Sequence, residues 1–229
     1  MAADEELDGL KGAGPPRPYP RFVNRRVVNR RALLGLAVAA LGSVPPVRAS
    51  ERAVVLLGLA VHVAREDGEP VADEAFIDRQ VETANRIFAP YGVQFERRER
   101  HERDARAARM ETRADRDALG AFVRPHWINV FVVASLMDVD EPQRVRRGVH
   151  WHSTSHAPAH YLVLSRISFD AVLAHELGHF LGNPRHSDTP GNLMSYQHTD
   201  VLPFLDEAQQ QRVRRSVAGY LRTGELQPG

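Results

Sequence analysis

Residues 175–186 read HELGHFLGNPRH, and this stretch places three histidines at a spacing that suits a single metal ion. On a helix, positions i and i+4 lie on the same face, so His175 and His179 can bind one ion together. Gly182 can adopt a positive φ angle, which would end the helix and let the chain reverse. The reversal would bring His186 back to the ion. Three imidazoles that leave one position open are typical of a catalytic zinc site.

Glu176 follows the first of these histidines and is the candidate general base. Its carboxylate can reach a water molecule on the ion without being a ligand itself. Zinc lowers the pKa of a bound water from 15.7 to about 7. Glu176 would accept a proton from this water as it attacks a peptide carbonyl, and would then pass the proton to the leaving amine.

The pattern HExxHxxGxxH resembles the signature of the metzincin clan of zinc peptidases. Members of that clan carry a methionine turn below the zinc, and residues 192–196 (NLMSY) look like that turn. The resemblance implies that Met194 packs under the metal site and is not a ligand. Ser187 and the length of the segment up to Met194 are similar to matrixins. Tyr196 looks like the tyrosine that contacts zinc or stabilises the transition state in astacins and serralysins.

Alternating and helical hydrophobic patterns predict the remaining elements. Strands are expected at 52–63, 93–95, 127–136, 148–153 and 161–165. Helices are expected at 73–88, 169–181 and 206–221, and the charged stretch 96–117 is expected on the surface. This order, like the metzincin resemblance, implies an α+β fold: a twisted, mixed five-stranded sheet with two helices, then the methionine turn and a C-terminal helix.

Two alternative metal sites have to be considered. In gluzincins the third ligand is a distant glutamate, and Glu207 lies 28 residues after His179, but His186 at the expected spacing disfavours this assignment. The second alternative is a cluster of four histidines, in which His150 and His152 would share one face of a strand. This cluster either holds a structural metal, as in matrixins, or is exposed to solvent or lines the cleft; its members are His150, His152, His156 and His160.

The N-terminal region predicts export. Residues 1–24 are rich in proline, glycine and charge, and the apolar run 32–44 is too short to span a bilayer, which requires about 20 residues. Its length fits a signal peptide, and Val47-Arg48-Ala49 offers a cleavage site before Ser50. Arg30-Arg31 before the run resembles a twin-arginine signal. We therefore expect a leader at 1–49, a catalytic domain at 50–229, and a secreted or periplasmic protein without a stable membrane anchor.

Composition narrows the function classes. The chain has no cysteine, which excludes disulfides, thiolate ligands and a cysteine nucleophile. Residues 50–229 carry 22 basic and 25 acidic side chains, so their net charge of about −3 gives no reason to expect a nucleic-acid partner.

Together these features predict a secreted zinc-dependent endopeptidase that acts on a protein or peptide substrate. The substrate is expected to lie along an edge strand at 148–153. The alternative is a secreted zinc-binding protein without turnover. The sequence does not indicate an oligomeric state.

Overall fold

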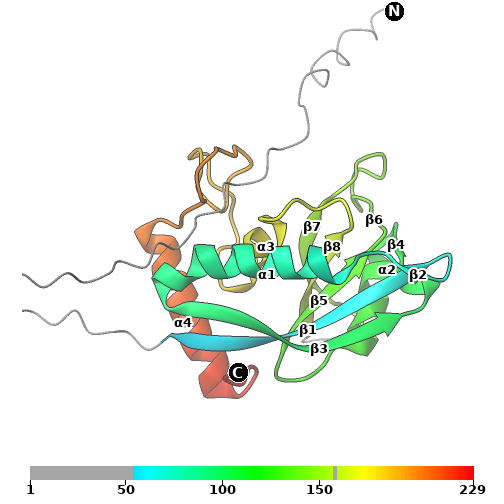
Figure 1. The fold of residues 1–229 in the computed structure, drawn as a ribbon, viewed down its shortest axis with the longest axis horizontal. Coiled ribbons are helices and arrows are strands. Elements are labelled where there is room, and N and C mark those ends of the chain that lie inside the picture. Colours follow the sequence, from blue (N-terminus) through cyan, green and yellow to red (C-terminus); the bar gives the residue numbers. More distant parts are fainter. Residues whose placement is uncertain (1–53, 157–158) are drawn as a thin grey trace, which may run out of the picture. The chain divides into compact units, whose positions relative to one another are not determined.

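In the computed structural model, which describes residues 54–156 and 159–229, the apolar segment after residue 54 forms the longest strand, β1 (Figure 1). The predicted signal peptide lies outside the described residues. The strands are β1 (Val55–Glu66), β2 (Glu69–Pro70), β3 (Val93–Arg103), β4 (Arg109–Met110), β5 (Ile128–Val133), β6 (Ser135–Leu136), β7 (Gly148–His152) and β8 (His160–Ser165). The helices are α1 (Glu74–Phe88), α2 (Arg113–Ala118), α3 (Val172–Phe180) and α4 (Glu207–Thr223).

The main sheet is mixed. β1 pairs in parallel with β3 and with β5, and β5 pairs in parallel with β8. β7 runs antiparallel to β8, and the two-residue strand β2 folds back on the end of β1. Within the described residues no strand pairs with the outer side of β7, so β7 is an edge strand. The edge strand and the parallel centre of the sheet match the expected α+β architecture.

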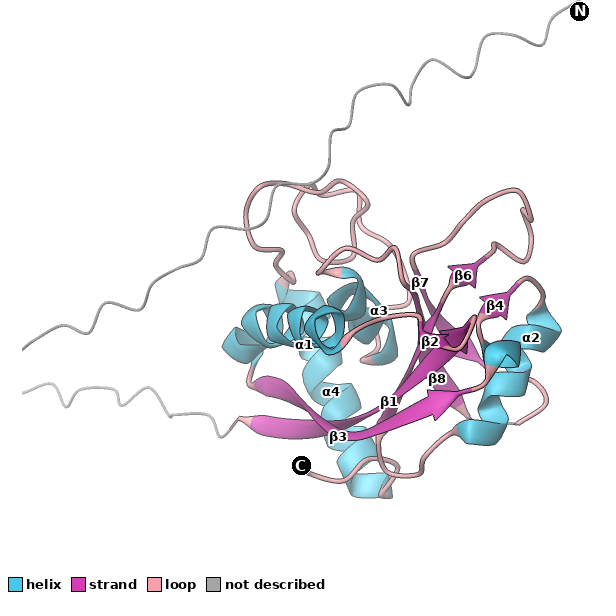
Figure 2. Ribbon diagram, turned by 45° about the vertical axis from the view of Figure 1, so that its right-hand side comes forward, coloured by secondary structure: helices cyan, strands magenta, loops and turns pink. Residues whose placement is uncertain are grey.

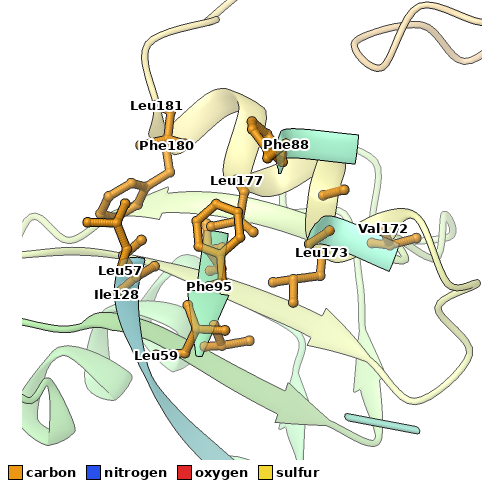
Figure 3. Packing of buried hydrophobic residues seen from close by; sticks show 14 of the residues in the cluster. Leu57, Leu59, Phe88, Phe95, Ile128, Val172, Leu173, Leu177, Phe180 and Leu181 are labelled. Carbon is orange, nitrogen blue, oxygen red and sulfur yellow. The ribbon is translucent and has the colours of Figure 1, made fainter. Parts of the chain in front are cut away.

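The sheet separates two apolar clusters, because alternate residues of its strands point to opposite faces. On one face, α1 and α3 cover Leu57 and Leu59 of β1 and Ile128 of β5 (Figure 3). Val213 and Val217 of α4 belong to the same cluster. On the other face, α2 and the segments around β4 and β6 cover Phe131 and Tyr161 (Figure 2). Both faces of the central strands are buried, which explains why β1, β5 and β8 are almost continuously apolar.

Two strand predictions differ from the structure. The strand expected at 93–95 continues to Arg103, because it is an edge strand and can carry charged side chains on its open face. Some of these charges pair with α1, for example Arg100 with Glu74 at 2.6 Å. The strand expected at 127–136 ends at Val133, and residues 135–136 instead pair with β4 in a separate two-stranded sheet.

Helix α3 also starts later than expected, at Val172 and not at Phe169. Its N-terminus has no side-chain cap of its own. Gln80, a buried residue of α1, provides one: its Oε1 accepts from the Leu173 amide at 3.0 Å and its Nε2 donates to the Phe169 carbonyl at 2.9 Å. The start of α3 is therefore set by a distant helix.

Among the described residues, no helix is both long enough and apolar enough to cross a membrane.

Candidate metal centre and active site

His175 and His179 lie one turn apart on α3, as the i, i+4 spacing predicts. Each ring is fixed by a backbone carbonyl. His175 Nδ1 lies 2.7 Å from the carbonyl oxygen of Leu193, and His179 Nδ1 lies 2.8 Å from that of Asn183. Carbonyl oxygens only accept hydrogen bonds, so both Nδ1 atoms carry the proton. Each Nε2 is left with a free lone pair, as a metal ligand requires.

The chain reverses directly after α3. Gly182 has a φ of +93°, which confirms the expected positive angle. Its amide donates to the His179 carbonyl at 3.1 Å, and the Asn183 amide donates to the Gly178 carbonyl at 3.0 Å. This pair of bonds is a Schellman motif, which closes the helix and turns the chain back.

The reversal brings His186 to the two helical histidines. One ligand atom from each of His175, His179 and His186 lies within 4.8 Å of the others, and the Nε2 atoms of His179 and His186 are 3.2 Å apart. Zinc–nitrogen bonds of about 2.0–2.1 Å at tetrahedral angles place ligand nitrogens about 3.3–3.4 Å apart. Burial lowers the pKa of His175 to about 4, and it lowers those of His179 and His186, so the rings are neutral. Both the donor set and its spacing fit zinc.

Glu176 is a buried carboxylate that lines the same groove. Burial raises its pKa to about 8, while the backbone N–H of His150 and the charge of Arg146 act in the opposite direction. Among the ion pairs of the described residues none includes Glu176. A carboxylate in this environment takes up a proton readily near neutral pH, which is the property that a general base requires.

Met194 lies below the helix that carries the first two histidines. A Cβ atom at Gly178 would lie 2.4 Å from Met194 Sδ, so only glycine allows this close approach. Met194 is fully buried, as expected for a packing residue.

The methionine turn is anchored to α4 by two buried amides. Asn192 Nδ2 donates to Gln209 Oε1 at 2.7 Å, and Gln209 Nε2 donates to Asn192 Oδ1 at 3.0 Å. The same Gln209 Oε1 accepts from the amide of Asp206, the N-cap of α4. Because Leu193 holds His175, this pair indirectly positions a candidate metal ligand.

Tyr196 lies beside the histidines with 62% of its surface exposed. Its ring centroid is 4.4 Å from that of His186 and 5.9 Å from that of His175. The side chain lines the groove and is free to meet a bound ligand.

The groove itself has a volume of about 730 Å³. It is lined by β7, by residues of α3 and by Tyr196 and His198. Arg146, in the segment before β7, lines it and is held by an ion pair with Asp138.

The two alternative metal sites have different outcomes. Glu207 is exposed at the first turn of α4, where it contacts Gln211. The histidine group that contains His175 and His179 is completed by His186 and not by Glu207. In the four-histidine cluster, His150, His152 and His160 converge, whereas His156 lies outside the group.

Several supporting groups could not be found from the sequence. The His150 amide that holds Glu176 and the Leu193 and Asn183 carbonyls are backbone atoms, so no residue type marks them. Gly178 could have been recognised from the sequence. A glycine inside a helix lowers the stability of the helix, so its presence indicates that another group packs closely against it.

Comparison with known proteins identifies the fold. No protein-family model matches the sequence, and no curated protein matches it. Mirolysin in complex with compound 9 has a TM-score of 0.54 at 10% identity, covering 76% of this chain and 99% of that chain. Mature mirolysin of Tannerella forsythia in complex with a cleaved peptide has a TM-score of 0.53 at 14% identity, with the same coverage of 76% and 99%.

A third structure, metalloproteinase-II from Bacteroides fragilis, has a TM-score of 0.48 at 15% identity and covers 72% of this chain. The present chain spans 55% of the length of that protein. The likeness to mirolysin establishes a shared fold, and the expected metzincin-like α+β architecture is confirmed.

Proposed function

We propose that this chain is a secreted zinc-dependent endopeptidase. The observation that carries the proposal is the convergence of His175, His179 and His186 next to a buried Glu176, in a groove bounded by an edge strand. A zinc-binding protein without turnover would need the three histidines, but it would not need a buried carboxylate without an ion-pair partner beside them. A buried, unpaired carboxylate reduces stability, so its presence favours a catalytic role.

The imidazoles of His175, His179 and His186 would hold the ion. When bound there, zinc supplies a Lewis acid that makes water deprotonation accessible near neutral pH. The Leu193 and Asn183 carbonyls keep two of the ligand rings in the tautomer that binds metal.

Glu176 would move the proton. Its carboxylate accepts a proton from the attacking water and then delivers that proton to the nitrogen of the departing amine. The backbone N–H of His150 lowers the pKa of this carboxylate against the effect of burial, and so would favour the ionised form that accepts the proton. Tyr196, whose ring lies next to that of His186, would donate a hydrogen bond to the developing negative oxygen of the substrate.

The substrate would bind as an added strand along β7. The outer side of β7 has no strand partner in the described part of the chain, and β7 lines the groove. Backbone hydrogen bonds to an edge strand favour extended or unfolded peptide segments. The structure of mature mirolysin with a cleaved peptide supports a peptide ligand for this fold.

Peptide hydrolysis with metal removal tests the proposal. The purified chain should cleave an unfolded protein such as casein, lose this activity when a chelator removes the metal, and recover it when zinc is returned. A zinc-loaded chain that leaves casein and a diverse peptide library uncut would instead support the non-catalytic alternative.

We also propose that the protein is exported through the leader at 1–49. N-terminal sequencing of the exported protein should begin at or near Ser50, and replacing Arg30-Arg31 by two lysines should block export if the twin-arginine route is used. Recovery of exported material that starts at Met1 or Ala2 would contradict the proposal.

A further inference from the structure

A second group of three histidines lies beside the candidate metal ligands, and two of its members, His150 and His152, line the same groove. One ligand atom from each of His150, His152 and His160 lies within 4.8 Å of the others, the same spacing that the first group meets. The closest pair is His150 Nε2 and His160 Nδ1, 2.9 Å apart. The two groups are separate, since no histidine belongs to both.

The strand register creates this group. His150 and His152 are two residues apart on β7, so their side chains share one face. On the neighbouring strand β8, His160 is the register partner of His152. The three rings therefore meet on one face of the sheet edge, where His160 stacks on Phe180 with ring centroids 4.3 Å apart.

A carboxylate from the far end of the chain completes the arrangement. Glu225 follows α4, and its Oε1 lies 2.8 Å from Nε2 of His160. A carboxylate only accepts when ionised, so His160 carries its proton on Nε2 and keeps the Nδ1 lone pair directed at His150. A histidine ligand is typically oriented by a carboxylate on its other nitrogen in this way.

A hydrogen bond between His150 and His160 would explain why these two rings lie close together, but it would not explain the position of the His152 ring. Nε2 of His150 could donate to Nδ1 of His160, but the His152 ring makes no hydrogen bond with any described residue, although it stacks on His160 at 5.2 Å. A metal ion between the three nitrogens would use all three rings.

We propose that His150, His152 and His160 form a second zinc site, in which Glu225 orients the His160 ring. Imidazole ligands suit zinc, and the partly exposed position of His152 leaves room for a water molecule as fourth ligand. The ion would join β7 to β8 and, through Glu225, to the C-terminal segment. β7 also packs against Glu176, whose Oε1 would lie 2.7 Å from a Cβ atom at Gly148, so the ion would also stabilise the strand beside the candidate base.

Zinc stoichiometry in the full chain tests the proposal. The chain has no cysteine, and residues 1–53 contain no histidine, so thiolates or leader histidines do not add to the count. After equilibration in a zinc-buffered solution, elemental analysis should give two zinc ions per chain. His152→Ala should retain one ion, because it removes a ligand of the second site only. Its side chain is exposed, so the change should leave the core intact. His156→Ala, the matched control from the same segment, should retain two.

A second pair of variants separates this site from the first. His186→Ala should lose the other zinc ion and keep the one at His150, His152 and His160. Glu225→Gln keeps all ligands and should weaken the second site by about 10–100-fold in zinc affinity. If the candidate active site binds no zinc, the parent chain holds one ion that His152→Ala removes and His186→Ala does not. The proposal is overturned if His152→Ala binds as much zinc as the parent, with unchanged affinity.

Discussion

His62 is a fully buried histidine in the middle of β1 and is remote from the metal ligands in sequence. Arg103 donates to its Nδ1, so the proton is on Nε2, which donates to Asn129 Oδ1 at 3.0 Å. The ring also stacks on Phe131. Burial lowers the pKa of His62 to about 4, and the nearby charge of Arg103 acts in the same direction. The fold therefore requires the neutral ring.

This requirement predicts a pH dependence of stability. In the unfolded chain His62 titrates near 6.5, so its contribution is fully present above that pH and is lost as the pH falls through 6.5 towards 4. A shift of this size corresponds to about 3 kcal/mol. His62→Gln cannot titrate and should lose less stability over this range. Denaturant unfolding of both proteins with the metal removed measures the two slopes, and equal slopes would contradict the assignment.

The joint between the methionine turn and α4 is an example of one element positioning another. The buried side chain of Gln209 contacts both Asn192 of the turn and Asp206, the N-cap residue of α4. Gln209→Met would keep the volume but leave the Nδ2 donor of Asn192 without an acceptor. We expect a loss of about 1–3 kcal/mol in the free energy of unfolding.

The same change should weaken zinc binding, because Leu193 next to Asn192 holds His175. Loss of such a supporting contact typically costs about 10–100-fold in metal affinity. Gln211→Met, an exposed position on the same helix, is the matched control and should change stability by less than about 0.5 kcal/mol. Equal effects of the two changes on stability and zinc affinity would show that the joint does not support the metal site.

Element boundaries followed the sequence where local chemistry sets them. The helix predicted at 206–221 forms at Glu207–Thr223 with Asp206 as its N-cap, because a capping residue and an amphipathic pattern both lie in the segment itself. The start of α3 was missed, because its cap is Gln80 from another helix. Likewise, β3 extends to Arg103 because it pairs with β1 along its length. The charged residues after position 95 do not indicate this pairing by themselves.

At the scale of the whole molecule, the candidate active site could largely be predicted, because its metal ligands and general base lie within the twelve residues 175–186. His175 and His179 follow from helical spacing, and His186 from the reversal at Gly182. The second histidine group could be predicted only in part. The shared face of His150 and His152 follows from strand geometry, whereas the approach of Glu225 depends on the complete fold.

The most direct test of the account is Glu176→Gln. The change keeps nearly the same side-chain volume and leaves His175, His179 and His186 intact, so the protein should fold and hold the parent amount of zinc. Only the carboxylate that moves the proton is lost. General base catalysis typically contributes about 10²–10⁴-fold, and the same group also serves as the acid, so we expect peptide cleavage to fall by about 10⁴-fold or more.

His186→Ala is the comparison, since it should lose the zinc as well as the activity. Peptide-cleavage rates and zinc content would be measured on the parent and both variants in parallel. The account predicts that Glu176→Gln retains the full zinc content of the parent and is nearly inactive. A Glu176→Gln protein that cleaves peptide at close to the parent rate with full zinc would contradict it.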